Sequence, residues 1–219
     1  GITLVSGNKK NPLYTTTFGV GEMIKDAIQK GCRHFIVGIG GSATNDCGIG
    51  MLQALGYEFL DIDGKQVGYG ATGVRDIVKI EDKNVLKELN ECNFRVACDV
   101  TNPLCGESGC SAVFGPQKGA TKQMVKDMDS WLYSFSNLVK EKYPGSDCEY
   151  PGTGAAGGGW GGAAAAAQVG GLDQIHELVG GHPPGPGQAL VTAVGAVGLQ
   201  GPGALPVPHV GDGGREGPR

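Results

Sequence analysis

The stretch HFIVGIGGSATNDCG, residues 34–48, carries most of the information about the fold. Its first part, residues 34–39, is an apolar run with the length of a buried strand. A glycine-rich loop with four polar residues follows, and residues 49–55 then have the pattern of a short helix. A strand, a glycine-rich loop and a helix in this order are typical of α/β proteins, which bind ligands at the carboxyl ends of their strands.

The segments on both sides of this stretch also indicate an α/β fold. Apolar residues three and four positions apart predict a helix over 20–28, and the run 94–98 predicts a second buried strand. A long helix capped by Thr121 is expected to extend to about Lys142. The sequence also predicts a hairpin over 57–67, a strand over 76–80, a helix over 84–90 and an extended segment over 111–114. Helices that alternate with apolar strands predict a sheet with crossover helices.

The composition changes abruptly near Pro151. Residues 151–219 hold 21 of the 41 glycines and 8 of the 12 prolines, and they contain no Lys, Ser, Asn, Phe, Tyr, Met or Cys. Such a segment reads as low-complexity or disordered, with two helical turns possible over 172–179 and no regular structure expected from Gly180 onward. The simultaneous loss of residue types with A/T-rich codons suggests an out-of-frame or artefactual segment, with a natural Gly/Pro linker as the alternative.

Charge and cysteine content exclude several classes of protein. The 219 residues carry 18 basic and 22 acidic side chains, for a net charge of −4, which argues against a nucleic-acid or anionic-membrane partner. No apolar run is long enough to span a bilayer, and residues 1–10 lack the apolar core of a secretory signal. The seven cysteines form no C-x-x-C pair, so free thiols in a cytoplasmic protein are expected rather than a zinc site.

The loop over residues 38–48 is the first candidate site. Its glycines let a ligand approach the backbone, and its N–H groups and polar side chains can bind an anion near a helix N-terminus. The residues concerned are Gly40, Gly41, Ser42, Thr44, Asn45 and Asp46. Spacing alone also matches G-x-G-x-x-A with Asp61 further on, so a nicotinamide-dependent dehydrogenase is an alternative. A glycine turn made only for packing is the structural alternative.

Three further segments carry groups suited to an anionic ligand. Asp99 follows the strand 94–98, where it could hold Mg²⁺ or simply cap a turn. Lys118 precedes the long helix and suits a phosphate or carboxylate, although an isolated loop lysine is often a solvated surface charge. Residues 151–158, PGTGAAGG, form a second loop of the anion-binding type. Anion loops combined with a carboxylate favour phosphoryl transfer, which depends on positioning and charge neutralisation.

On these motifs the chain resembles the bacterial two-domain glycerate kinase family. The matching text is Asn11-Pro12-Leu13, Thr15-Thr16-Thr17, and residues 38–48, 97–106, 112–121 and 151–158. The resemblance implies ATP- and Mg²⁺-dependent phosphorylation of D-glycerate, with 2-phosphoglycerate as the expected product. It also implies a three-layer α/β/α second domain over residues 1–158, without the family's N-terminal lobe and followed by a non-matching tail over 159–219. A non-catalytic glycerate- or anion-binding fragment is the alternative that follows from the missing lobe.

The resemblance also assigns roles to individual residues. Asp46, Asp99 and Lys118 are the expected catalytic residues, with Asp46 and Asp99 as candidates for the general base and Asp99 as the Mg²⁺ ligand. Lys118 is expected to neutralise charge on the glycerate carboxylate or on the transferring phosphoryl group. The expected substrate- or phosphate-binding residues are Gly40, Gly41, Ser42, Thr44, Asn45, Asn102, Gly152, Thr153 and Gly154.

Overall fold

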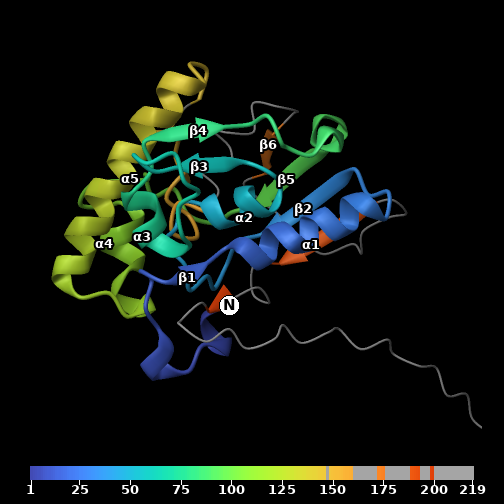
Figure 1. The fold of residues 1–219 in the computed structure, drawn as a ribbon. Coiled ribbons are helices and arrows are strands. Elements are labelled where there is room, and N and C mark those ends of the chain that lie inside the picture. Colours follow the sequence, from blue (N-terminus) through green and yellow to red (C-terminus); the bar gives the residue numbers. More distant parts are fainter. Residues whose placement is uncertain (147, 160–171, 176–187, 193–197, 200–219) are drawn as a thin grey trace, which may run out of the picture.

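The main sheet has four parallel strands. A computed structural model describes residues 1–146, 148–159, 172–175, 188–192 and 198–199 (Figure 1). The strand order is β6 (Leu172–Ile175), β5 (Asn93–Ala97), β2 (His34–Gly38) and β7 (Gln188–Thr192). Gly38 pairs with both Ala97 and Thr192, so β2, β5 and β7 end together at one edge of the sheet. The predicted α/β class, a sheet with crossover helices, is confirmed.

The two central strands form because alternate residues enter the core. Phe35 and Val37 of β2 and Phe94 and Val96 of β5 are buried, and the rings of Phe35 and Phe94 stack with their centroids 4.7 Å apart. Each such side chain contributes about 1.5–3 kcal/mol when it is fully buried. This burial fixes the register of β2 against β5, and the register places the loops that leave the two strands side by side.

The helices lie on either side of this core (Figure 1). α1 (Phe18–Gln29) packs against α2 (Ile49–Ala54), closely enough that a Cβ at Gly21 would lie 2.3 Å from the carbonyl oxygen of Met51. α5 (Lys122–Lys142) packs against α3 (Gly70–Arg75) and α4 (Cys110–Phe114). The predicted cap is confirmed, because the Met124 N–H donates to Thr121 Oγ1 at 3.2 Å. Within the described ranges, every helix is too short or too polar to cross a bilayer.

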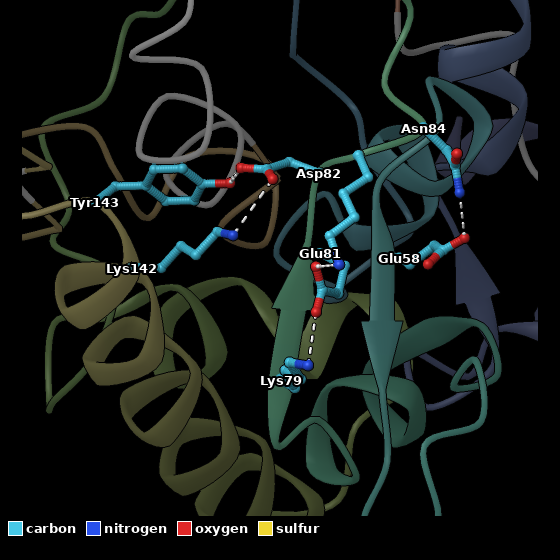
Figure 2. Close-up of polar contacts among 8 residues, drawn as sticks. Glu58, Lys79, Glu81, Asp82, Asn84, Lys142 and Tyr143 are labelled. Carbon is cyan, nitrogen blue, oxygen red and sulfur yellow. Dashed lines mark hydrogen bonds and ion pairs between the residues drawn. The ribbon is translucent and has the colours of Figure 1, made fainter.

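A small antiparallel pair, β3 (Glu58–Leu60) and β4 (Lys79–Glu81), is fastened to the end of α5. The Tyr143 hydroxyl donates to Asp82 Oδ2 at 2.9 Å, and Lys142 Nζ donates to Asp82 Oδ1 at 3.3 Å (Figure 2). The hairpin predicted over 57–67 is reduced to one bridge between Leu60 and Gln66, because β3 forms its ladder with β4 instead. Strand β4 spans Lys79–Glu81, whereas the sequence predicts a strand over 76–80.

Several shorter segments differ from the sequence predictions. The helix expected over 84–90 is a 3₁₀ turn, η3 (Lys87–Glu91). The segment 111–114, expected to be extended, lies in α4 because the Val113 N–H donates to the Gly109 carbonyl and the Gly115 N–H to the Ser111 carbonyl, which closes helical turns. The N-terminal segment contains η1 (Ile2–Leu4), η2 (Gly7–Lys9) and β1 (Thr15–Thr16), and η4 (Pro116–Lys118) precedes α5.

The predictions for the glycine-rich tail are wrong where the structure describes it. Residues 172–175 form strand β6 rather than a helix, and β7 and β8 (Gly198–Leu199) lie where no regular structure was expected. β6 pairs with β5, β7 with β2, and β8 with β1, so strands that are already in place supply their hydrogen-bond partners. Pairing with an existing sheet overrides the weak propensity of the segment. The rest of the prediction for residues 159–219 lies outside the described residues.

Candidate functional site

The glycine-rich loop leaves the carboxyl end of β2 and rests on the N-terminal segment. The Ile2 N–H donates to the Gly41 carbonyl, and the Thr15 hydroxyl donates to the Ala43 carbonyl, both at 2.7 Å. Gly40 and Gly41 remain exposed, and a Cβ at either residue would meet nothing within 4 Å. Ser42 is half-buried. The loop therefore has a fixed inner side and an open tip, which suits it to receive a ligand.

Asp46 is fully buried and organises the base of this loop. Its Oδ2 accepts hydrogen bonds from the N–H and hydroxyl of Thr17, at 2.8 and 2.9 Å, and its Oδ1 accepts one from the Gly48 N–H at 3.3 Å. The Thr17 hydroxyl in turn accepts from the Met51 N–H at 2.9 Å. Burial raises the pKa of Asp46, although its hydrogen bonds oppose that shift. Asp46 thus joins the starts of α1 and α2 to the loop.

Lys118 is 2 % exposed and donates a hydrogen bond of 2.6 Å to the Thr44 carbonyl. The interpretation of Lys118 as a solvated surface charge is therefore wrong. Lys118 is buried because η4 turns its side chain inward, under the loop that follows β2. Burial lowers the pKa of Lys118 to about 8.

Four successive backbone donors of the loop have no acceptor among the described residues. Within the described part of the chain, the N–H groups of residues 42–45 make no hydrogen bond, and Ala43, Thr44 and Asn45 are buried. The Asn45 side chain donates to Ser111 Oγ at 2.9 Å, while its Oδ1 is buried and meets no donor among these residues. Buried backbone donors are nearly always paired in folded proteins, and successive free N–H groups form concavities that bind anions.

Asp99 and Asn102 lie on the neighbouring loop, which leaves β5. Asp99 is exposed, and its carboxylate makes no hydrogen bond or ion pair with another described residue, so it does not cap the turn. Asn102 is half-buried and donates to the Ser108 carbonyl at 2.9 Å. No group of three or more His, Cys, Asp or Glu gathers within the described ranges. A single free carboxylate still suits Mg²⁺, which is commonly held by one or two carboxylates together with substrate phosphates.

The glycine loop over 151–159 closes the arrangement from a third direction. The Gly154 N–H donates to the Asn102 carbonyl at 3.0 Å, and the Cys47 N–H donates to the Gly157 carbonyl at 3.3 Å. Thr153 is buried, and its hydroxyl donates to the Cys148 carbonyl at 3.1 Å. Gly152 lies against the β5 loop, where an added Cβ would be 3.1 Å from the Val100 carbonyl oxygen. This loop therefore contacts both of the loops that leave the sheet.

The structure thus separates the predicted residues into two groups. Thr44, Asn45, Asp46, Lys118 and Thr153 are buried and hold loops together. Gly40, Gly41, Ser42, Asp99 and Asn102 are exposed or half-buried, where a ligand can reach them.

Thr17, Ser111 and Gly157 contribute to the same site without having been assigned roles from the sequence. The run Thr15-Thr16-Thr17 could have indicated a role for Thr17. Ser111 was missed because residues 111–114 were predicted to be extended. Gly157 could not be distinguished from its glycine neighbours.

Comparison with known proteins decides the family. A sequence model of the glycerate kinase family matches residues 1–184. The chain belongs to the glycerate kinase family. The match extends past residue 158, where the resemblance in the sequence ended. Family membership also decides against a nicotinamide-dependent dehydrogenase. That alternative needs Asp61 or Asp63 as a ribose ligand, and Asp61 instead accepts hydrogen bonds from the N–H groups of Asp63 and Lys65 in the turn after β3.

Individual glycerate kinases support this assignment. The chain is 50 % identical over 158 residues to a glycerate kinase of Haemophilus influenzae. The aligned region covers 72 % of this chain and 42 % of the relative. It is 44 % identical to a glycerate 2-kinase of Escherichia coli, with the same coverage of both chains. A crystal structure described as a glycerate kinase 2 from Salmonella typhimurium LT2 has a TM-score of 0.74 and 43 % identity, over 79 % of this chain and 46 % of that one. The chain therefore spans less than half the length of these relatives.

Proposed function

We propose that this chain forms part of an enzyme that transfers a phosphoryl group from ATP to a hydroxyl of D-glycerate, with Mg²⁺, to give 2-phosphoglycerate. Membership of the glycerate kinase family supports the reaction class. The name of the Escherichia coli relative, a glycerate 2-kinase, supports the 2-phospho product. The structural observation that carries the proposal is the row of N–H groups over residues 42–45 that have no acceptor among the described residues, because both glycerate and the phosphates of ATP are anionic.

The open residues are the ones that we expect to contact ligands. Gly40, Gly41 and Ser42 at the loop tip would bind the anionic group, with Asn102 beside them on the next loop. Asp99 is the exposed carboxylate, so it is better placed than the buried Asp46 to hold Mg²⁺ or to accept the hydroxyl proton of glycerate. When bound, Mg²⁺ would neutralise the charge that develops on the phosphates.

The buried residues are expected to act by holding the loops. Asp46 fixes the base of the loop after β2 through Thr17 and Gly48, and Lys118 adds a positive charge beneath it. Gly152, Thr153 and Gly154 keep the third loop against the second. Such preorganisation is the main contribution that a protein makes to phosphoryl transfer.

We also infer that the enzyme works in the cytoplasm. All seven cysteines are free thiols, and Cys47, Cys92, Cys110 and Cys148 are buried in the core. Unpaired cysteines in this number are expected where thiols stay reduced.

Thermal denaturation of the purified chain with D-glycerate, MgATP or NAD, each in large excess, tests ligand binding. A ligand at 100 times its Kd stabilises the folded state by about 2.7 kcal/mol, or roughly 5–11 °C in a protein of this size. We expect D-glycerate or MgATP to raise the Tm and NAD to leave it unchanged. Stabilisation by NAD alone would contradict the proposal.

Phosphorus NMR of the chain incubated with D-glycerate and MgATP separates turnover from binding. A new phosphomonoester signal that matches authentic 2-phosphoglycerate is the expected result. A signal that matches 3-phosphoglycerate would correct the position of transfer. Binding without any product would identify the chain as a glycerate- or anion-binding unit.

A further inference from the structure

Three segments distant in the sequence meet around the side-chain nitrogen of Lys118. The nitrogen donates to the Thr44 carbonyl at 2.6 Å, 74 residues earlier. Gly157 lies against the same two atoms. A Cβ added there would be 2.0 Å from the Thr44 carbonyl oxygen and 2.9 Å from the Lys118 nitrogen. Only glycine leaves room there. The ammonium is therefore enclosed by the loop after β2 and by the loop over 151–159.

The hydrogen bond to Thr44 sets the direction of the next donor in the loop. In a planar trans peptide the C=O and the following N–H point in opposite directions. Because the Thr44 carbonyl faces the ammonium, the Asn45 N–H points away from it. That N–H belongs to the row over residues 42–45 that has no acceptor within the described part of the chain. Lys118 thus orients a donor that it does not itself touch.

The charge on Lys118 weakens the fold at neutral pH. Burial lowers its pKa from 10.5 to about 8, so the unfolded chain binds this proton more tightly than the folded one does. Stability attributable to Lys118 therefore rises as the pH increases from 8 to 10.5. A buried charge that opposes folding is typical of functional sites rather than of structural ones.

Cys110 and Asp46 are the titratable groups whose charges act on Lys118. Burial raises the pKa of Cys110, on α4, to about 11, and raises that of Cys47, in the loop, well above its usual value. Asp46 is an acid whose pKa burial raises from 3.8. Residues 151–159 contain no titratable side chain, and on the N-terminal side the Lys10 backbone carbonyl borders Gly119. Burial also lowers the pKa of the Gly1 amino group from 8.0, and the Ile2 N–H donates to the Gly41 carbonyl, so a change in the loop is assigned to Lys118 only where its midpoint matches that of the Lys118 side chain.

We propose that Lys118 is a positioning residue for anion binding: its ammonium holds the Thr44 carbonyl and so fixes the loop whose open tip, Gly40 to Ser42, receives the ligand, and an anion bound there draws a proton onto Lys118. The identity of the anion, the glycerate carboxylate or a phosphate, rests on the proposed function. The positioning itself is independent of that identity. The proton comes from solvent, and no covalent bond changes.

An NMR titration of the ligand-free chain from pH 6.5 to 9.5 tests the positioning. The amide signals of Asn45 and Gly157 should shift with a midpoint near 8, together with the side-chain signals of Lys118. The shift should persist in Lys122→Met, which removes an exposed lysine at the start of α5, and vanish in Lys118→Met. If Lys118→Met does not fold, the wild-type signals decide alone. Absence of the transition, or different midpoints for Lys118 and Asn45, would overturn the proposal.

Calorimetry with D-glycerate and with inorganic phosphate, in buffers of different ionisation enthalpy, tests the coupling. Above pH 8 wild-type binding should take up about one proton, and the affinity should fall up to about tenfold per pH unit. Binding without proton uptake would overturn the coupling. If neither anion binds while the NMR transition is present, the positioning role stands and the proposed function of the loop fails.

Discussion

A single carboxylate oxygen of Asp46 accepts two hydrogen bonds from Thr17, from its N–H at 2.8 Å and its hydroxyl at 2.9 Å. The other oxygen accepts from the Gly48 N–H. One buried side chain thereby joins the residue before α1 to the turn before α2. The loop that carries the unpaired N–H groups is anchored at this point, so its shape depends on residues outside the loop.

Asp46→Ala is expected to destabilise the fold severely. It leaves the donors of half-buried Thr17 and buried Gly48 without their acceptor, which should cost about 3 kcal/mol or more. Asp46→Asn should cost less, because its amide oxygen still accepts from Thr17. Urea denaturation measures both, with Asp63→Ala as a control, since that carboxylate is 70 % exposed. Equal stability of Asp46→Ala and the control would contradict this anchoring role.

A pair of glycine variants should isolate the close approach at Gly157. Gly157 and Gly64 have nearly the same φ, 75° and 74°, but a Cβ at Gly64 would meet nothing within 4 Å. Gly64→Ala should therefore cost only the left-handed conformation, about 1 kcal/mol. Gly157→Ala adds the clash with the Thr44 carbonyl, which should bring its cost to about 2–4 kcal/mol. If both variants lose the same stability in thermal denaturation, the close approach of Gly157 to the Thr44 carbonyl has no effect on the fold.

Tyr143→Phe should reveal a pH-dependent fastening of α5 to the small sheet (Figure 2). Burial of Asp82 opposes its ionisation, but hydrogen bonds from Tyr143 and Lys142 outweigh that effect and lower its pKa from 3.8. Its stabilising effect is therefore complete above pH 4 and disappears as the pH falls through the folded-state pKa. Because the Asp82 side chain is 39 % exposed, the loss at pH 7 should be only about 0.5–1 kcal/mol.

Denaturation at pH 7 and at pH 3 checks this fastening, with Tyr133→Phe, at a tyrosine that is 61 % exposed, as the control. The difference between wild type and Tyr143→Phe should shrink at pH 3. A difference that stayed constant, or a loss of the same size in Tyr133→Phe, would show that the hydrogen bond to ionised Asp82 is not its origin.

Asp99→Asn should weaken nucleotide binding without weakening the fold. Its carboxylate is exposed and has no partner within the described residues, so stability should change by less than about 0.5 kcal/mol. If Asp99 holds Mg²⁺, the affinity for MgATP should fall about 10-fold or more, while the affinity for ATP in EDTA stays unchanged. An equal loss with and without Mg²⁺ would remove Asp99 from metal binding.

The sequence predicts the parts of this fold whose cause is local. Strands β2 and β5 follow from their apolar runs, and α5 follows from its periodicity and the Thr121 cap. Strand β6 has no comparable local signal, and β7 has only the short run Leu190-Val191-Thr192 in a glycine- and proline-rich segment. Pairing with β5 and β2 stabilises both strands. Val113 and Phe114 favour a strand by type, and hydrogen bonds between residues four apart make the segment from Cys110 to Phe114 helical instead.

The candidate site shows the same division between local and non-local causes. The glycine and polar composition of residues 38–48 was enough to predict an anion loop. Whether a charged residue faces the ligand or the core depends on packing between distant segments, so the burial of Asp46 and Lys118 could not be predicted from their neighbours. The four N–H groups without an acceptor in the described part of the chain could not be predicted either, because every residue except proline has one.

The hydrogen bond between Cys47 and Gly157 ties together two segments that a ribosome delivers at very different times. The strand, loop and helix around Cys47 are synthesised early, whereas the loop that holds them in place follows more than a hundred residues later. Contacts between such distant segments form late in folding, because the chain between them must first lose its freedom. We therefore expect a nascent chain to acquire its central strands first and its capacity to bind an anion last.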